Sequence, residues 1–162
     1  MKRLNVLNVL EQLINESYFH CEWAIEWQEQ NHNIELSFQM ELENPNQKIF
    51  WKDNKTYSQN KEIVFIMSVL IYDSKANSYS NDCHSILIPF DFDQGVEYGE
   101  CLSLVKYLKV LTSTVPVKWR EFMESNQAHS FTVDWNWNDY NKIKNRLIDS
   151  KQYSHTLVYF PN

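Results

Sequence analysis

Five glutamates occupy the polar positions of two neighbouring segments in which polar and apolar residues alternate. They are Glu22, Glu26, Glu35, Glu41 and Glu43. Carboxylates held close together can share a proton, as general acid and base catalysis requires, or can bind a divalent cation. Left in water, the same residues form an acidic face that discourages edge-to-edge pairing of strands or attracts a basic partner.

The two segments predict a β-hairpin that brings carboxylates together. Residues 19–28 and 34–43 alternate strictly, and residues 31–33 between them (Asn-His-Asn) favour a turn. In one register Glu26 lies opposite Glu35, and in the register shifted by two residues Glu22 lies opposite Glu41. Directly opposed side chains lie about 5 Å apart, so either register would raise the pKa of one carboxyl group.

A second acidic pattern follows a later predicted strand, where Asp91 and Asp93 flank Phe92. Alternating aspartates after a strand can bind a metal–nucleotide complex in glycosyl transfer. The same tripeptide is also typical of a turn followed by a helix N-terminus, because aspartate side chains accept hydrogen bonds from nearby backbone N–H groups. We interpret it as such a turn, with Asp93 helping to start the next helix.

The three cysteines offer little chemistry of their own. Cys21 follows His20, and Cys83 precedes His84, but neighbours on a strand point to opposite faces and cannot act as nucleophile and base. With Cys101 they form no C-x-x-C pair, so neither a disulfide framework nor a four-thiolate zinc site is expected. Reduced, mostly buried thiols are the interpretation.

Tryptophans recur in two pairs, Trp23 with Trp27 and Trp135 with Trp137. Aromatic side chains on an exposed sheet can stack on sugars or bases. On the inner face of a sheet they belong to the core, and their even spacing with Ile25 favours this second interpretation.

Composition excludes several classes of function. The chain has 162 residues, a net charge of −6 and only two glycines, and it contains none of the glycine-rich loops that bind phosphates. Residues 1–100 carry 16 acidic and 7 basic residues, and residues 101–162 carry 5 and 8. Without a dense basic stripe we expect no nucleic-acid partner. Five of the basic residues in the second part form a weak basic region that we interpret as solvated helix faces; they are Lys118, Arg120, Lys142, Lys144 and Arg146.

The sequence also indicates where the protein acts. No apolar run approaches the ~20 residues that a membrane helix needs, and the first residues lack the pattern of a secretory signal. We therefore expect a cytoplasmic protein with no membrane partner and no cofactor.

The periodicities predict one α+β domain over residues 1–162, with the order αββββααβαβ. Trp23 and Phe38 should face the core and the glutamates water. The strand over residues 62–72 should be a central strand that is buried on both faces, or one that is covered by a helix. We expect a mostly antiparallel sheet of about 5–6 strands with helices packed on one face. The predicted helices cover 3–17, 97–113, a segment starting at Pro116, and 139–150, and the predicted strands cover 19–28, 34–43, 62–72, 84–92, 131–137 and 153–160.

Three stretches resemble the family called Domain of Unknown Function 3013, a family of small proteins from Gram-positive bacteria. They are residues 22–38, residues 88–91 (Ile-Pro-Phe-Asp) with the helix that follows, and residues 131–135 (Phe-Thr-Val-Asp-Trp). The polar segment over residues 52–60 departs from that pattern. The resemblance implies a small cytoplasmic bacterial protein and transfers no active residues.

These observations favour a non-enzymatic binding or regulatory module, a monomer or homodimer, whose acidic face meets another protein. That face comprises Glu22, Glu26, Glu35 and Glu41. Two alternatives stay open. A small carboxylate- or metal-dependent hydrolase would use the hairpin carboxylates or Asp91 and Asp93, and would need a deep pocket that holds at least two of them. A small-ligand or sugar-binding module would need exposed tryptophans.

Overall fold

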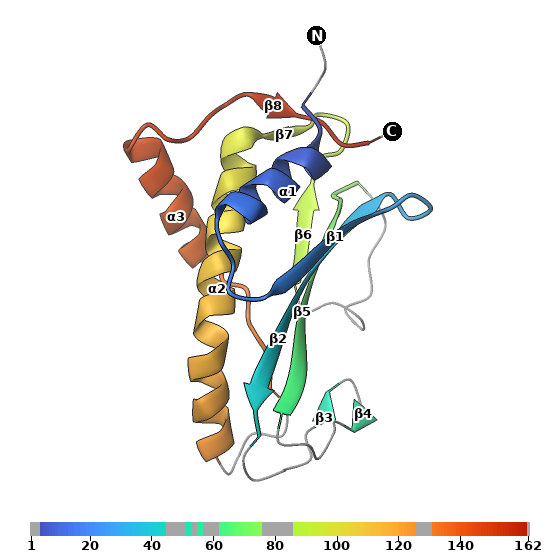
Figure 1. Cartoon of the computed structure of the whole chain (residues 1–162). Coiled ribbons are helices and arrows are strands. Elements are labelled where there is room, and N and C mark those ends of the chain that lie inside the picture. Colours follow the sequence, from blue (N-terminus) through green and yellow to red (C-terminus); the bar gives the residue numbers. More distant parts are fainter. Residues whose placement is uncertain are drawn as a thin grey trace.

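The computed structural model describes residues 4–44, 51–52, 55–56, 62–75, 86–125 and 131–161 (Figure 1). Its helices are α1 (Val6–Glu16), α2 (Tyr98–Glu124) and α3 (Trp137–Asp149). Its strands are β1 (Glu22–Gln28), β2 (Asn33–Glu43), β3 (Trp51–Lys52), β4 (Lys55–Thr56), β5 (Glu62–Asp73), β6 (Ile86–Phe90), β7 (Val96–Glu97) and β8 (Leu157–Val158). Within the described ranges, most of the predicted strands and helices of the first half of the chain are present, with ends shifted by a few residues.

The main sheet has four strands in the order β1-β2-β5-β6. The first three run antiparallel, whereas β6 runs parallel to β5, with Val69 opposite Ile86. The prediction of a mostly antiparallel sheet of 5–6 strands is therefore wrong: the sheet is mixed and has four strands. The sequence of a short apolar strand such as β6 does not show whether the strand runs parallel or antiparallel to its neighbour. Alternation of polar and apolar residues indicates only which face of a strand is buried.

Two separate pairs of short strands complete the described strands. β3 pairs with β4, and β7 pairs with β8. Both pairs are antiparallel and two residues long, and Val96 of β7 and Val158 of β8 are buried in the core.

The core lies between one face of the sheet and the helices α1 and α2 (Figure 1). α1 begins where the Asn5 Oδ1 atom accepts a hydrogen bond from the Leu7 backbone N–H at 2.8 Å, as an N-cap residue should. Its apolar stripe, which includes Leu10 and Ile14, is buried. Phe38 and Met67 face these helices from β2 and β5, and neither is accessible to solvent.

β5 is buried less completely than its composition predicts. Met67, Val69 and Ile71 are buried, but Val64 and Ile66, on the outer face of the same strand, are 45% and 44% exposed. The strand over residues 62–72 is therefore covered on both faces only in its second half.

α2 is one continuous helix of 27 residues, so the prediction of two helices separated near Pro116 is wrong. Proline inside a helix costs about 3 kcal/mol, because it lacks the backbone N–H and crowds the preceding turn. Val115 and Trp119 are buried on either side of it, and each such side chain contributes about 1.5–3 kcal/mol. Tertiary packing thus outweighs the local preference. No helix among the described residues, α2 included, is long and apolar enough to cross a membrane.

The chain after α2 differs most from the prediction. Residues 131–136 form no strand, and α3 begins at Trp137, where the Asn136 Oδ1 atom accepts from the Asp139 backbone N–H at 3.1 Å. The alternation that predicted a strand over 131–137 is real, since Phe131 packs on the core and Val133 is buried. The alternation arises because the side chains of this segment point in turn toward the core and toward solvent. Among the described residues, no strand pairs with the segment.

The predicted strand over residues 153–160 is reduced to β8 and one bridge. Tyr159 pairs with the start of the chain: its N–H donates to the Leu4 carbonyl at 2.8 Å, and its carbonyl accepts from Val6 at 2.9 Å. α3 packs against α2, and β7 and β8 lie beside α1 at the same end of the molecule (Figure 1).

Candidate functional site

The hairpin register brings one pair of the predicted carboxylates together. Glu26 lies opposite Glu35, and Glu22 lies opposite Gln39 instead of Glu41. The Gln28 side-chain amide donates to the Glu35 carboxylate at 2.7 Å, so one of the opposed carboxylates has a donor of its own. The first of the two registers is confirmed.

The acidic residues of the hairpin lie on the side of the sheet that faces away from the core. Glu22, Glu26 and Glu41 are exposed and Glu35 is half-buried, whereas Phe38 is buried and Trp23 packs partly buried against the core. The predicted division into an apolar inner face and an acidic outer face is therefore confirmed for the hairpin.

β2 continues beyond the end of β1, and this leaves part of its edge open. β1 pairs with residues 33–39 of β2 and reaches no further. Residues 40–43 pair with β5 on one side, and no strand among the described residues pairs with their other side (Figure 1). At the end of this stretch the Trp119 indole N–H, on α2, donates to the Glu43 carbonyl at 2.7 Å.

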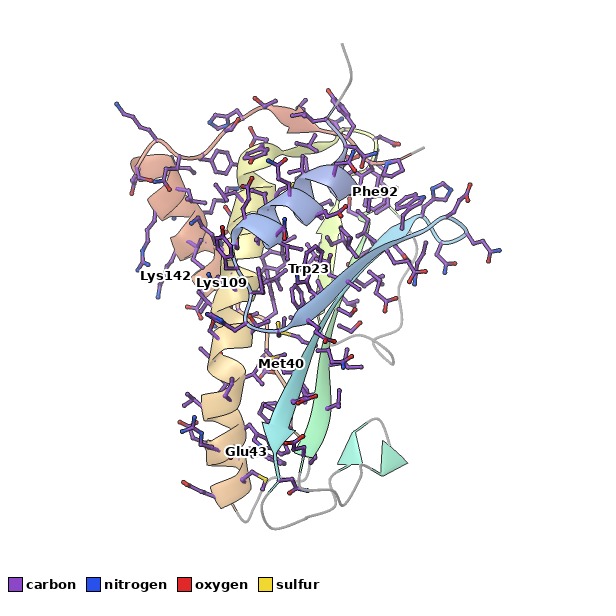
Figure 2. All side chains as sticks on the ribbon, viewed as in Figure 1. Trp23, Met40, Glu43, Phe92, Lys109 and Lys142 are labelled. Carbon is purple, nitrogen blue, oxygen red and sulfur yellow. The ribbon has the colours of Figure 1, made fainter. Side chains whose placement is uncertain are left out.

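Two adjacent cavities lie along this open edge, between β2 and α2. The first has a volume of about 650 Å³ and the second about 560 Å³. Both are lined by Glu41, Leu42 and Pro116, so they form neighbouring parts of one groove, here called the β2 groove. Figure 2 shows Met40 and Glu43 on the strand beside α2.

Carboxylates dominate the charge of the β2 groove. Glu22 and Glu41 line its first cavity, and Glu43 and Glu124 line its second with Glu41. The second cavity also contains the cation Arg120. The electrostatic potential of such a groove favours a positively charged occupant. The described residues contain no group of three or more histidines, cysteines, aspartates or glutamates placed to hold a metal ion.

The described cysteines, of which Cys21 lines the groove, are poor nucleophiles. Burial raises the pKa of the Cys21 thiol, which lines the first cavity beside the exposed His20. Burial also raises the pKa of Cys101 to about 12. Both thiols therefore stay protonated near neutral pH, and the thiolate needed for nucleophilic attack is scarce. The other proposed neighbours, Cys83 and His84, lie outside the described residues.

The aspartate tripeptide forms a turn. Asp91 accepts hydrogen bonds from the backbone N–H groups of Asp93 and Gln94, each at 3.0 Å, and these bonds lower the pKa of Asp91. Lys75 donates to Asp93 at 2.9 Å. The prediction that Asp93 starts the next helix is wrong, since α2 begins after Glu97.

Three of the four paired tryptophans pack against the core. Trp23 and Trp27 pack partly buried against it, and Trp135 meets Tyr107 edge-on with ring centres 4.6 Å apart. Trp137 starts α3 and is 45% exposed. Trp135 and Trp137 meet edge-on with ring centres 5.3 Å apart, but Trp137 alone of the four is largely exposed, so the four side chains present no wide aromatic surface to solvent.

Sequence reasoning missed the α2 side of the groove. Thr112, Ser113, Trp119 and Arg120 lie on the helix that spans Pro116, a residue at which the sequence predicted a break. The two hairpin segments also looked equal in length, whereas β2 has 11 residues and β1 has 7. No sequence signal we recognise predicts that difference.

The fold and the groove define a small α+β protein in which one long helix packs beside a mixed four-stranded sheet, with an acidic groove at the sheet edge. The chain belongs to the family described as "Protein of unknown function (DUF3013)", whose model matches residues 1–162. Comparison with curated proteins finds no match. A crystal structure described as a conserved protein of unknown function from Enterococcus faecalis is similar, with a TM-score of 0.82 and 19% identity over 100% of this chain and 98% of that chain. At this identity the likeness establishes the fold alone.

Proposed function

We propose that this protein is a non-enzymatic, cytoplasmic binding module that holds an extended, basic segment of a partner protein in the β2 groove. The observation that carries the proposal is the open edge of β2 over residues 40–43. An extended peptide can add a strand to such an edge, because alternate residues of the edge turn their backbone N–H and C=O groups toward it. At the end of the edge the Glu43 carbonyl already accepts from Trp119, so the peptide would bond to the residues before it. Four residues of strand span about 14 Å, enough for a segment of similar length.

The charge of the groove supports a basic occupant. Glu22, Glu41 and Glu43 surround the open edge on the sheet side, and Arg120 opposes them from α2. Exposed ion pairs contribute about 0.2–1 kcal/mol each, and hydrogen bonds about 0.5–1.5 kcal/mol each. We therefore expect weak, salt-sensitive and reversible binding, which suits a regulatory contact. The free thiols of Cys21 and Cys101 agree with a reducing compartment such as the cytoplasm.

Peptide arrays test the proposal directly. An array of octapeptides with lysine fixed at alternate positions, and the other positions varied, is incubated with the labelled protein at low salt. A second array carries glutamate in place of lysine. We expect binding only on the lysine array, and the best peptide is then resynthesised with N-methylated backbone amides. That change keeps every charge but removes N–H donors, so binding should fall at least about tenfold.

Matched variants locate the site. Glu41→Lys reverses a charge inside the groove, and Glu26→Lys makes the same change on the same sheet face outside the groove lining. Glu41→Lys should weaken binding and Glu26→Lys should not. Equal binding of the N-methylated peptide, or equal effects of the two variants, would show that the edge of β2 is not the binding site.

A small carboxylate-dependent hydrolase is the second candidate, because Glu22 and Glu41 line one cavity together with His20. Both carboxylates are exposed, so burial does not desolvate them as catalytic carboxylates commonly require. Mass spectrometry of the bound peptides after prolonged incubation separates the two candidates, since a hydrolase returns fragments and a binding module returns intact peptide.

A further inference from the structure

A third cavity lies on the other side of α2, between α2, α3 and the residues that follow α1. Its volume is about 830 Å³, within the usual range for small-molecule sites. It shares only Ser113 with the β2 groove. We call it the α2–α3 cleft.

The floor of the α2–α3 cleft is largely apolar. Val110 from α2 and Ile143 and Leu147 from α3 line it, and Tyr18 borders it. Val110 is 48% exposed and Tyr18 is 78% exposed. Apolar side chains left in water on one concave surface favour a ligand with an apolar body.

The rim of the α2–α3 cleft is cationic. Lys106, Lys109 and Arg146 line it, against the single acid Glu16. In a chain whose net charge is −6, this is a local reversal of sign. Lys142 lies on α3 outside this lining (Figure 2).

Two of these cations are not used by the fold. Within the described residues, Lys106 and Arg146 form no ion pair, whereas Lys144 on the same helix as Arg146 is half-buried and paired with Glu100. Lys109 is held in place, because its ammonium group donates to the Ser17 carbonyl at the end of α1. The cleft thus has one fixed cation and two that are available to a ligand.

We propose that the α2–α3 cleft binds a small amphipathic anion, with its carboxylate or phosphate group at Lys106, Lys109 and Arg146 and its apolar body over Val110, Ile143 and Leu147. Arginine binds carboxylates and phosphates through two parallel hydrogen bonds, and lysine adds a point charge beside it. The proposal is independent of the β2 groove, because no acidic residue of that groove lines the cleft.

Titration calorimetry of the full chain tests the proposal with four probes. Decanoate and octyl phosphate carry both an anion and an apolar chain, and they distinguish a carboxylate from a phosphate ligand. Methyl decanoate keeps the chain without the charge, and inorganic phosphate keeps a charge without the chain. We expect at least one of the first two to bind, and to bind at least about tenfold more tightly than the last two.

Three variants locate the binding. Lys106→Ala combined with Arg146→Ala removes two exposed cations that support no described contact, and it should weaken binding at least about tenfold. Val110→Glu, also at an exposed position, should do the same by placing a like charge on the apolar floor. Lys142→Ala removes a cation from α3 outside the cleft and should leave affinity unchanged. Far-ultraviolet circular dichroism confirms that each variant is folded.

Each outcome of these titrations either supports the proposed site or overturns it. Binding of an amphipathic anion that the double variant and Val110→Glu weaken, and Lys142→Ala spares, supports the proposal. It is overturned if neither amphipathic anion binds, if methyl decanoate binds as tightly as decanoate and octyl phosphate, or if Lys142→Ala weakens binding as much as the double variant.

Discussion

Replacing Gly99 with alanine should destabilise the protein, although alanine is the better helix former. Gly99 lies in the first turn of α2, and the Tyr153 ring packs directly on it. A Cβ atom at Gly99 would lie 2.3 Å from the Tyr153 Cδ2 and Cε2 atoms, where an ordinary contact is 3.4–4 Å. The ring would have to retreat by about 1 Å, a displacement that a close-packed interior resists.

The ring has little freedom to retreat. The Gly99 N–H donates to the Ser154 carbonyl at 2.9 Å, and the Tyr153 hydroxyl donates to Glu97 at 3.0 Å. Overpacking costs about 1–3 kcal/mol, whereas glycine to alanine in a helix gains at most about 1 kcal/mol. Gly99→Ala should therefore lower the free energy of unfolding by about 1–2 kcal/mol.

Urea unfolding of four proteins measures this effect. They are the wild type, Gly99→Ala, Tyr153→Ala and the double variant. With the ring removed, the alanine methyl group has room, and Gly99→Ala should become neutral or stabilising by up to about 1 kcal/mol. If Gly99→Ala destabilises equally in both backgrounds, the close approach of Tyr153 is not the reason for glycine at this position.

Three further predictions concern stability. The pKa of Cys101 is about 12 in the folded chain against 9.0 for a free thiol, so the unfolded state loses this proton first as pH rises above 9. The free energy of unfolding should therefore fall by up to about 1.4 kcal/mol per pH unit. Urea titrations between pH 8 and 10 should show a shallower fall for Cys101→Ala. The hydrogen bond with His155 is the largest of the effects that lower the pKa of Glu97. The carboxylate therefore stabilises the fold above the ordinary glutamate pKa of 4.5, and this stabilisation should be lost as pH falls below that value. Acid titrations of Glu97→Gln should show a smaller loss of stability. Pro116→Ala restores a backbone donor at an exposed position inside α2 and should raise the free energy of unfolding by about 1 kcal/mol or more, measured in urea; a loss of stability would show that the proline is needed there.

Strict alternation predicted the hairpin and its two faces correctly. It worked because a residue that faces the core, such as Phe38, cannot exchange places with a glutamate that faces water without reversing the whole strand. It left two registers open, and the register seen here places Glu26 opposite Glu35. The family resemblance was also correct, since the family model matches the whole chain.

The errors arose where long-range packing decides the structure. The direction of β6 and the continuity of α2 through Pro116 depend on neighbours distant in sequence, which local patterns do not contain. Residues 131–136 alternate because their side chains pack alternately on the core, and the absence of a pairing strand among the described residues is invisible to that pattern. The β2 groove and the α2–α3 cleft escaped prediction for the same reason.

The pairing of Tyr159 with Leu4 and Val6 bears on how the chain folds during synthesis. α1 completes its contacts only when residues 157–160 are available, and β7 likewise waits for β8. Because synthesis proceeds from the N-terminus, α1 lacks the backbone hydrogen bonds to Tyr159 until β8 and the residues after it have been made. Contacts between such distant residues also slow folding, because a long loop must close before they form. Removal of residues 157–160 should therefore leave α1 poorly protected from hydrogen exchange.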